Sequence, residues 1–214
     1  MFEGLKRTAA ADAGIITATL PAVVALLSVI AGERLSRPQW SAVALAVSGL
    51  VLVHAGGAAA GPSTLVGNLL VGGAVLCEAS FVLLGKRLAP PYQPLRLALG
   101  ANLVGLLLAL PLAGIDLPGF DPAAITPAMW LLGIWYALAA SVICLWLWYR
   151  ALPYVETWLA GLATAAIPVA ALAVSAMYLG ESIGGIRIAG ATLVIAGIVL
   201  GAMAPERRRV PPPA

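Results

Sequence analysis

One helix-length segment occurs twice in this chain, and this repetition limits the folds that are open to it. Residues 13–33 read AGIITATLPAVVALLSVIAGE, and residues 160–181 read AGLATAAIPVAALAVSAMYLGE. Each copy is an apolar run that ends in Gly-Glu. The central prolines, Pro21 and Pro168, occupy matching positions. An internal repeat of this kind indicates a duplicated structural unit, which any fold of the chain has to contain twice.

The apolar runs between and around the two copies predict a helical membrane protein. The chain is 62% hydrophobic and 10% charged, with a mean hydropathy of +1.01, whereas soluble domains are about 25% charged. Only helices or closed barrels satisfy their backbone in lipid, and these runs are too long and too uniformly apolar for barrel strands. We expect an all-α polytopic protein in the lipid bilayer with about seven transmembrane helices. The predicted spans are about residues 11–31, 40–55, 64–84, 96–112, 129–149, 158–179 and 186–203.

The basic residues predict the orientation of these spans. They fall at helix ends, which is typical of membrane topology and does not indicate a nucleic-acid surface. One side of the membrane would carry Arg34, Arg37, Lys86, Arg87, Arg96, Arg150, Arg207, Arg208 and Arg209, and the other Lys6, Arg7 and Arg187. Because cytoplasmic loops are enriched in Lys and Arg, we expect a multi-pass cell-membrane protein with a cytoplasmic C-terminus.

The repeat and the topology together predict an inverted arrangement. The two copies occupy the first and sixth spans, and an odd number of crossings between them makes them antiparallel, as in secondary transporters. Three spans precede the second copy within its half, whereas none precedes the first. We therefore expect that three helices are missing at the N-terminus, through truncation or a misplaced start codon.

The repeated pattern resembles the EamA-type transporters of the drug/metabolite transporter superfamily. The resemblance rests on a mid-helix proline, a Gly-Glu pair and a later helix with glycines. The matching residues are Pro21, Gly32, Glu33 and Gly49, and again Pro168, Gly180, Glu181, Gly190 and Gly197. This resemblance implies ten helices in two inverted five-helix repeats that work by alternating access. Residues 1–57 would be the last two helices of the first repeat, residues 58–204 the complete second repeat, and residues 205–214 a disordered cytoplasmic tail.

The two prolines predict a site near the middle of the membrane. Proline has no N–H and displaces the carbonyl of the residue four positions earlier, which is Thr17 for Pro21 and Thr164 for Pro168. One hypothesis is that two symmetry-related kinks line the substrate pathway. The alternative is a packing kink whose threonine hydroxyl satisfies its own helix.

Glu78 is an ionisable residue inside the third predicted span, where an ionised carboxyl is costly. Gly67 and Ala74 share its helical face, while Leu69 and Leu76 lie opposite, so we expect Glu78 to point inward. It is the candidate coupling carboxylate for a proton or a cation. The alternative is a protonated glutamate that hydrogen-bonds a neighbouring helix.

Three further ionisable or polar residues, Asn102, Glu33 and Glu181, are candidates for the pathway or its gates. Asn102, inside the fourth span, could bind substrate or a helix neighbour. Glu33 and Glu181 each end a helix, where bracing of a gate competes with simple ion pairing. The expected ion-pair partners are Arg34, Arg37 and Arg187. His54 ends its helix and is interpreted as a solvated surface imidazole.

Glycines of the repeat predict close helix packing. Gly49 and Gly197 correspond in the two copies, and Gly197 and Gly201 form a GxxxG face that a homodimer could use.

The function that these features favour is secondary transport of small organic metabolites or drugs, with export as the expected direction. If the short chain is the true product, a non-transporting membrane scaffold or a half-transporter is the alternative. An enzyme is not expected, because HExxH and paired intramembrane carboxylates are both missing from the sequence. No cofactor and no metal site are expected either.

Overall fold

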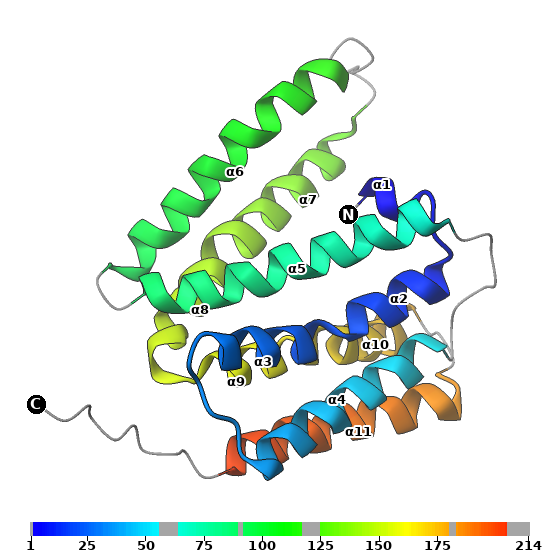
Figure 1. Ribbon diagram of the computed structural model, residues 1–214. Coiled ribbons are helices and arrows are strands. Elements are labelled where there is room, and N and C mark those ends of the chain that lie inside the picture. Colours follow the sequence, from blue (N-terminus) through cyan, green and yellow to red (C-terminus); the bar gives the residue numbers. More distant parts are fainter. Residues whose placement is uncertain (1, 56–63, 90–91, 117–124, 180–182, 205–214) are drawn as a thin grey trace, which may run out of the picture. The chain divides into compact units, whose positions relative to one another are not determined.

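The fold is helical throughout the part of the chain that the computed structural model describes, residues 2–55, 64–89, 92–116, 125–179 and 183–204 (Figure 1). The helices are α1 (Phe2–Leu5), α2 (Ala10–Ala18), α3 (Leu20–Ile30), α4 (Arg37–Ala55), α5 (Leu65–Leu88), α6 (Pro94–Asp116), α7 (Pro127–Ala137), the π-helix η3 (Leu138–Cys144), α8 (Leu145–Ala151), the 3₁₀-helix η4 (Leu152–Tyr154), α9 (Thr157–Ala163), α10 (Ala166–Leu179) and α11 (Gly185–Met203). The predicted all-α class is confirmed.

Seven helical segments in the described residues are long and apolar enough to cross a membrane. They are Asp12–Ile30, Arg37–Ala55, Leu65–Leu88, Pro94–Pro111, Pro127–Tyr154, Thr157–Tyr178 and Gly185–Met203. Each matches a span predicted from the sequence, so the chain is a multi-pass membrane protein. The predictions for Glu181 and for the tail at 205–214 lie outside the described residues.

The chain divides into two compact units, which are described separately. The first unit comprises Met1–Leu83 and Glu156–Ala214, and the second comprises Leu84–Val155. The first unit holds both copies of the repeated segment. The second unit is built from α6, α7, η3 and α8, whose large apolar side chains are mostly exposed, as a surface that faces lipid would be.

Both copies of the repeated segment are broken helices rather than single kinked ones. The first copy is split into α2 and α3 at Thr19, with Pro21 in the first turn of α3. The second is split into α9 and α10 at Thr164 and Ala165. Each break lies just before its proline, because the missing N–H removes the hydrogen bond that would continue the helix. Tighter i→i−3 bonds, such as Ala165 N to Leu162 O at 3.1 Å, close the turns at the breaks.

Helices α4 and α11 lie side by side and antiparallel in the first unit (Figure 1). A Cβ atom on Gly49 would lie 2.6 Å from the carbonyl oxygen of Gly190, and a Cβ on Gly190 would lie 2.6 Å from the carbonyl oxygen of Gly49. The repeat relates this pair to Gly197 and Ala42, where the corresponding distance is 2.9 Å. The same backbone contact therefore occurs twice, as expected around a local two-fold axis.

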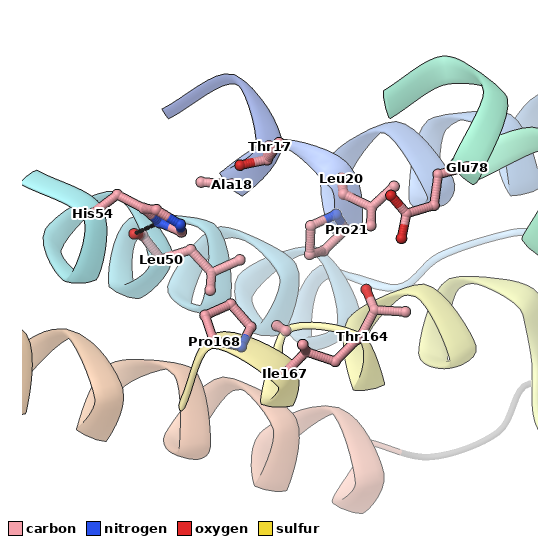
Figure 2. Close-up of a pocket in the computed structure, with 11 residues that line it drawn as sticks. Thr17, Ala18, Leu20, Pro21, Leu50, His54, Glu78, Thr164, Ile167 and Pro168 are labelled. Atoms are coloured by element: carbon pink, nitrogen blue, oxygen red, sulfur yellow. Dashed lines mark hydrogen bonds between the residues drawn. The ribbon is translucent and has the colours of Figure 1, made fainter. Parts of the chain in front are cut away.

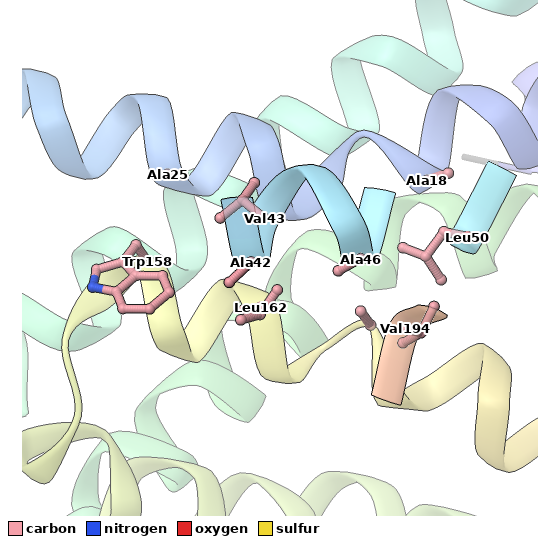
Figure 3. Packing of buried hydrophobic residues seen from close by; sticks show 10 residues of the cluster. Ala18, Ala25, Ala42, Val43, Ala46, Leu50, Trp158, Leu162 and Val194 are labelled. Carbon is pink, nitrogen blue, oxygen red and sulfur yellow. The ribbon is translucent and has the colours of Figure 1, made fainter. Parts of the chain in front are cut away.

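The buried core of the first unit joins these helices to α9 (Figure 3). Trp158 and Leu162 of α9 are almost fully buried. A Cβ atom on Gly201 of α11 would lie 2.5 Å from the side chain of Leu162. The predicted GxxxG face is therefore occupied within the chain, and it does not offer the dimer surface that the sequence suggested.

Candidate functional site

A pocket of about 200 Å³ lies in the first unit, where the two broken helices face each other. Both threonine–proline pairs line it, Thr17 with Pro21 and Thr164 with Pro168. Figure 2 shows these residues around one hollow, with Glu78 from α5. The structure thus brings together five of the residues that the sequence singled out.

The threonine hydroxyls of the pocket bond to their own helices. Thr17 Oγ1 donates to the carbonyl oxygen of Ala13 at 2.9 Å or of Gly14 at 3.0 Å. Thr164 Oγ1 donates to the carbonyl oxygen of Gly161 at 2.7 Å. These bonds match the second of the two interpretations, in which the hydroxyl satisfies its own helix. They use the hydroxyl hydrogens but leave an oxygen lone pair on each side chain.

Glu78 lies at the border of the packed face of α5. Val75 and Ala79 are buried on that face, while Leu76 is 54% exposed on the other side. The carboxyl group itself is exposed and lines the pocket. Glu78, which the sequence predicted to point inward, is thus an exposed residue at the edge of the pocket.

His54 was interpreted as a solvated surface residue, and that interpretation is wrong. The imidazole is only partly exposed and lines the pocket, with Nδ1 2.8 Å from the carbonyl oxygen of Leu50 (Figure 2). A Cβ atom on Gly14 would lie 2.5 Å from the ring. The ring therefore occupies a space that only a glycine in α2 leaves open.

At the other end of α4, Glu33 binds the first turn of α9. Its Oε1 accepts hydrogen bonds from Thr157 N at 3.1 Å and from Thr157 Oγ1 at 2.5 Å. A carboxylate is favoured there by the unpaired N–H groups and the dipole of the helix. The expected ion pair with a neighbouring arginine is wrong: no such bridge to Glu33 forms in the described part of the chain.

Glu156 continues this network from the N-cap position of α9. Its Oε2 accepts from Trp158 Nε1 at 2.5 Å and from Gln39 Nε2 at 3.5 Å. Gln39 is buried in the first turns of α4. The five residues Glu33, Gln39, Glu156, Thr157 and Trp158 are termed the polar cluster, and they tie α9 to the segment that links α3 and α4.

The two ends of the first unit differ in how the broken helices pack. At the end with the polar cluster, α3 packs closely on α9, and a Cβ atom on Gly161 would lie 2.4 Å from the buried Val24. At the end where His54 lies, the described parts of α2 and α10 have no comparable packing. The pocket lies on that less packed side, because it includes Leu50 and His54 from the last turns of α4.

Asn102 lies in the second unit and is not part of this pocket. Its Nδ2 donates to the carbonyl oxygens of Ala98, at 2.9 Å, and of Ser141, at 2.8 Å. These bonds hold α6 to the π-helix η3, where the wider turn displaces backbone groups. They correspond to the helix-neighbour alternative, while substrate contact by Asn102 stays a prediction.

A helical membrane protein with a small internal pocket at two broken helices is the class that this fold and site define. The sequence matches the EamA-like transporter family over residues 1–55 and 65–203. The chain therefore belongs to the EamA-like transporter family, and the resemblance found in the repeat motif is confirmed.

Two curated relatives are similar over most of this chain. One, from Bacillus subtilis (strain 168), is named "Uncharacterized transporter YetK" and is 31% identical over 202 residues, which are 92% of this chain and 61% of the relative. The other, from Salmonella typhimurium, is named "Probable amino-acid metabolite efflux pump" and is 28% identical over 194 residues, 87% of this chain and 64% of the relative. The chain thus spans less than two thirds of the length of both.

A solved crystal structure shares the fold. It superposes with a TM-score of 0.75 at 20% sequence identity, over 94% of this chain and 71% of the solved chain. At that identity the likeness supports the fold alone.

Proposed function

We propose that this protein is a secondary transporter of small organic metabolites that exports them by alternating access of two inverted repeats. The observation that carries the proposal is the pocket, which brings together the threonine–proline pairs of both copies. A carrier that opens one site to each side of the membrane in turn is built from repeats whose broken helices meet at that site.

The size of the pocket favours a small substrate. Its volume of about 200 Å³ is below the roughly 300–1,000 Å³ of pockets that hold drug-sized ligands. A metabolite therefore fits better than a large drug. The name of the Salmonella relative, a probable amino-acid metabolite efflux pump, supports the same size class.

Glu78 is proposed as the coupling carboxylate. It lines the pocket with the two threonines, so a proton or cation held there would share the site with the substrate. An ionisable residue inside a membrane segment is retained for such pathways more often than for packing.

The charge distribution supports an orientation. Arg34 and Arg37 lie beside the polar cluster, on the side that carries most of the lysines and arginines. We place that end and the C-terminus in the cytoplasm. In the conformation described here the cytoplasmic end is the more tightly packed one. Residues 1–57 and 58–204 are assigned to the first and second repeats.

The test is solute flux through the purified full chain in lipid vesicles. Vesicles loaded with a mixture of amino acids and their metabolites are diluted with and without an imposed proton gradient, and release is followed by mass spectrometry. We expect protein-dependent release that the gradient changes, that Glu78→Gln abolishes and that Glu3→Gln preserves. Glu3 is a matched control because it is exposed and pairs with Lys6 outside the spans.

Two results would contradict the proposal in different ways. Release no faster than from protein-free vesicles argues against transport by this chain and favours the scaffold alternative. Release that is equal in Glu78→Gln and Glu3→Gln leaves transport in place but removes Glu78 from the coupling.

A further inference from the structure

The polar side chains that line the pocket share one property, because each offers hydrogen-bond acceptors. An ionised carboxylate such as Glu78 only accepts. The hydroxyls of Thr17 and Thr164 have already given their hydrogens to carbonyl oxygens of their own helices. Their remaining lone pairs can therefore only accept from a ligand.

His54 adds a further acceptor through the geometry of its ring. A carbonyl oxygen cannot donate, so the 2.8 Å contact between Nδ1 and Leu50 O requires the hydrogen to be on Nδ1. In the neutral imidazole the other nitrogen, Nε2, is then an acceptor. Among the described residues, no hydrogen bond reaches Nε2.

Groups that would attract an anion are scarce around the same pocket. No lysine or arginine lines it in the described part of the chain. The first turns of α3 and α10 could present N–H groups to an anion, but Pro21 and Pro168 have none. The amides of Val23 and Ile167 are already bonded to the carbonyl oxygens of Thr19 and Thr164.

The histidine is a feature of this pocket and is not duplicated by the repeat. The position that corresponds to His54 in the second copy is Ala202, and the glycine that corresponds to Gly14 is Gly161. The side chain of Val24 fills the space beside Gly161. The space above Gly14 holds an imidazole instead, so the two copies differ at the end where the pocket lies.

We propose that the pocket selects a small solute that carries an ammonium group and a second hydrogen-bond donor. Glu78 would bind the ammonium group, and His54 Nε2 would accept from the second donor. His54 and Glu78 line the same pocket, and Figure 2 draws them at opposite ends of the residues shown. The solute that we infer would therefore be extended, with one donor group at each end. This inference rests on the proposed function, because it takes the pocket as the transport site.

The test uses four probes with the same carbon skeleton and different end groups, namely aminobutanol, butylamine, butanediol and succinate. Binding to the purified full chain in lipid nanodiscs is measured by isothermal titration calorimetry. We expect aminobutanol to bind roughly tenfold more tightly than butylamine, as one added hydrogen bond allows. Butanediol and succinate, which lack the ammonium group, should bind at least about tenfold more weakly than butylamine.

Two variants separate the two contacts. His54→Leu should remove the advantage of aminobutanol over butylamine and leave butylamine unchanged. Glu78→Gln should remove the preference for both amines over butanediol. Thr192→Val is the control, because Thr192 bonds its own helix in the same way as Thr17 but is exposed on α11, away from the pocket. Its binding profile should match that of the unchanged protein.

Several outcomes would overturn the inference. They are succinate binding as tightly as the amines, an advantage of aminobutanol that survives His54→Leu, and no binding of any probe. Binding of succinate and the absence of any binding are both measured on the unchanged protein. Either result overturns the proposal even if a variant fails to fold. Amines that bind as expected but never cross vesicles would refute transport instead, and flux of solutes without an ammonium group would refute only the substrate class.

Discussion

The contact between Glu33 and Thr157 gives the sharpest prediction for stability. Glu33 Oε1 accepts two hydrogen bonds from Thr157, one from the amide and one from the hydroxyl. Hydrogen bonds to charged groups contribute about 1.5–3 kcal/mol each. Thr157→Val keeps the shape of a side chain that is 1% exposed and removes only the hydroxyl bond, so it should lower the free energy of unfolding by about 1–2 kcal/mol.

Glu33→Ala should cost more, because it removes both bonds and the carboxylate at the start of α9. We expect a loss of about 2–4 kcal/mol. The second oxygen, Oε2, is enclosed without a hydrogen-bond partner in the described structure, and its removal offsets part of this loss. Because Thr157→Val cannot break a bond that Glu33→Ala has already removed, the double variant should be less destabilised than the sum of the two by about 1.5 kcal/mol.

The assay is equilibrium unfolding of the purified protein in mixed micelles with increasing dodecyl sulfate, followed by tryptophan fluorescence. Arg34→Gln serves as the control, because an ion pair between Glu33 and Arg34 was the competing interpretation of the sequence. The interaction free energy between Arg34→Gln and Glu33→Ala should lie within about 0.3–0.5 kcal/mol of zero. If Glu33 instead showed an interaction free energy with Arg34 and none with Thr157, its proposed contact with the first turn of α9 would be refuted.

Two further predictions concern packing in each unit. Gly49→Val should destabilise the protein by about 1–3 kcal/mol in the same unfolding assay, because its Cβ would lie 2.6 Å from the carbonyl oxygen of Gly190. Gly72→Ala, at a glycine with open space around it, is the control. Equal stability of the two variants would contradict the α4–α11 contact. Asn102→Leu should lower the free energy of unfolding by about 1 kcal/mol, because the bonds to Ala98 and Ser141 are lost. The affinity for aminobutanol and butylamine in calorimetry should not change. Weaker binding of these two probes would instead support a place for Asn102 in the substrate pathway.

The architecture could be predicted because membrane spans are encoded locally. Length and hydrophobicity of each run decide whether it crosses the bilayer, and all seven predicted spans occur in the structure. The position of the pocket could also be predicted, since a proline weakens its helix wherever the chain folds. Duplication of Pro21 as Pro168 added the information that two such breaks would face each other.

The roles of single polar side chains were harder to predict. Glu33 stands next to Arg34 in the sequence, and the ion pair was the local choice. Its actual partner, Thr157, is 124 positions away, so only the packing of α3 on α9 reveals it. His54 is similar: nothing along α4 marks it, and its place in the pocket depends on the space above Gly14 in another helix.

The same comparison explains why one end of the first unit is closed. Thr157, which donates to Glu33, and Glu156, which accepts from Trp158 and Gln39, belong to the second copy. Ala10 and Ala9 stand at the matching positions of the first copy. Alanine offers neither a carboxylate nor a hydroxyl, so the side-chain bonds of the polar cluster cannot be repeated at the opposite end with these residues. Two copies that share their proline, their glycines and their backbone contacts therefore differ in the polar bonds available to each end. That difference agrees with the packing, in which α3 closes on α9 while the pocket lies at the end of α2 and α10.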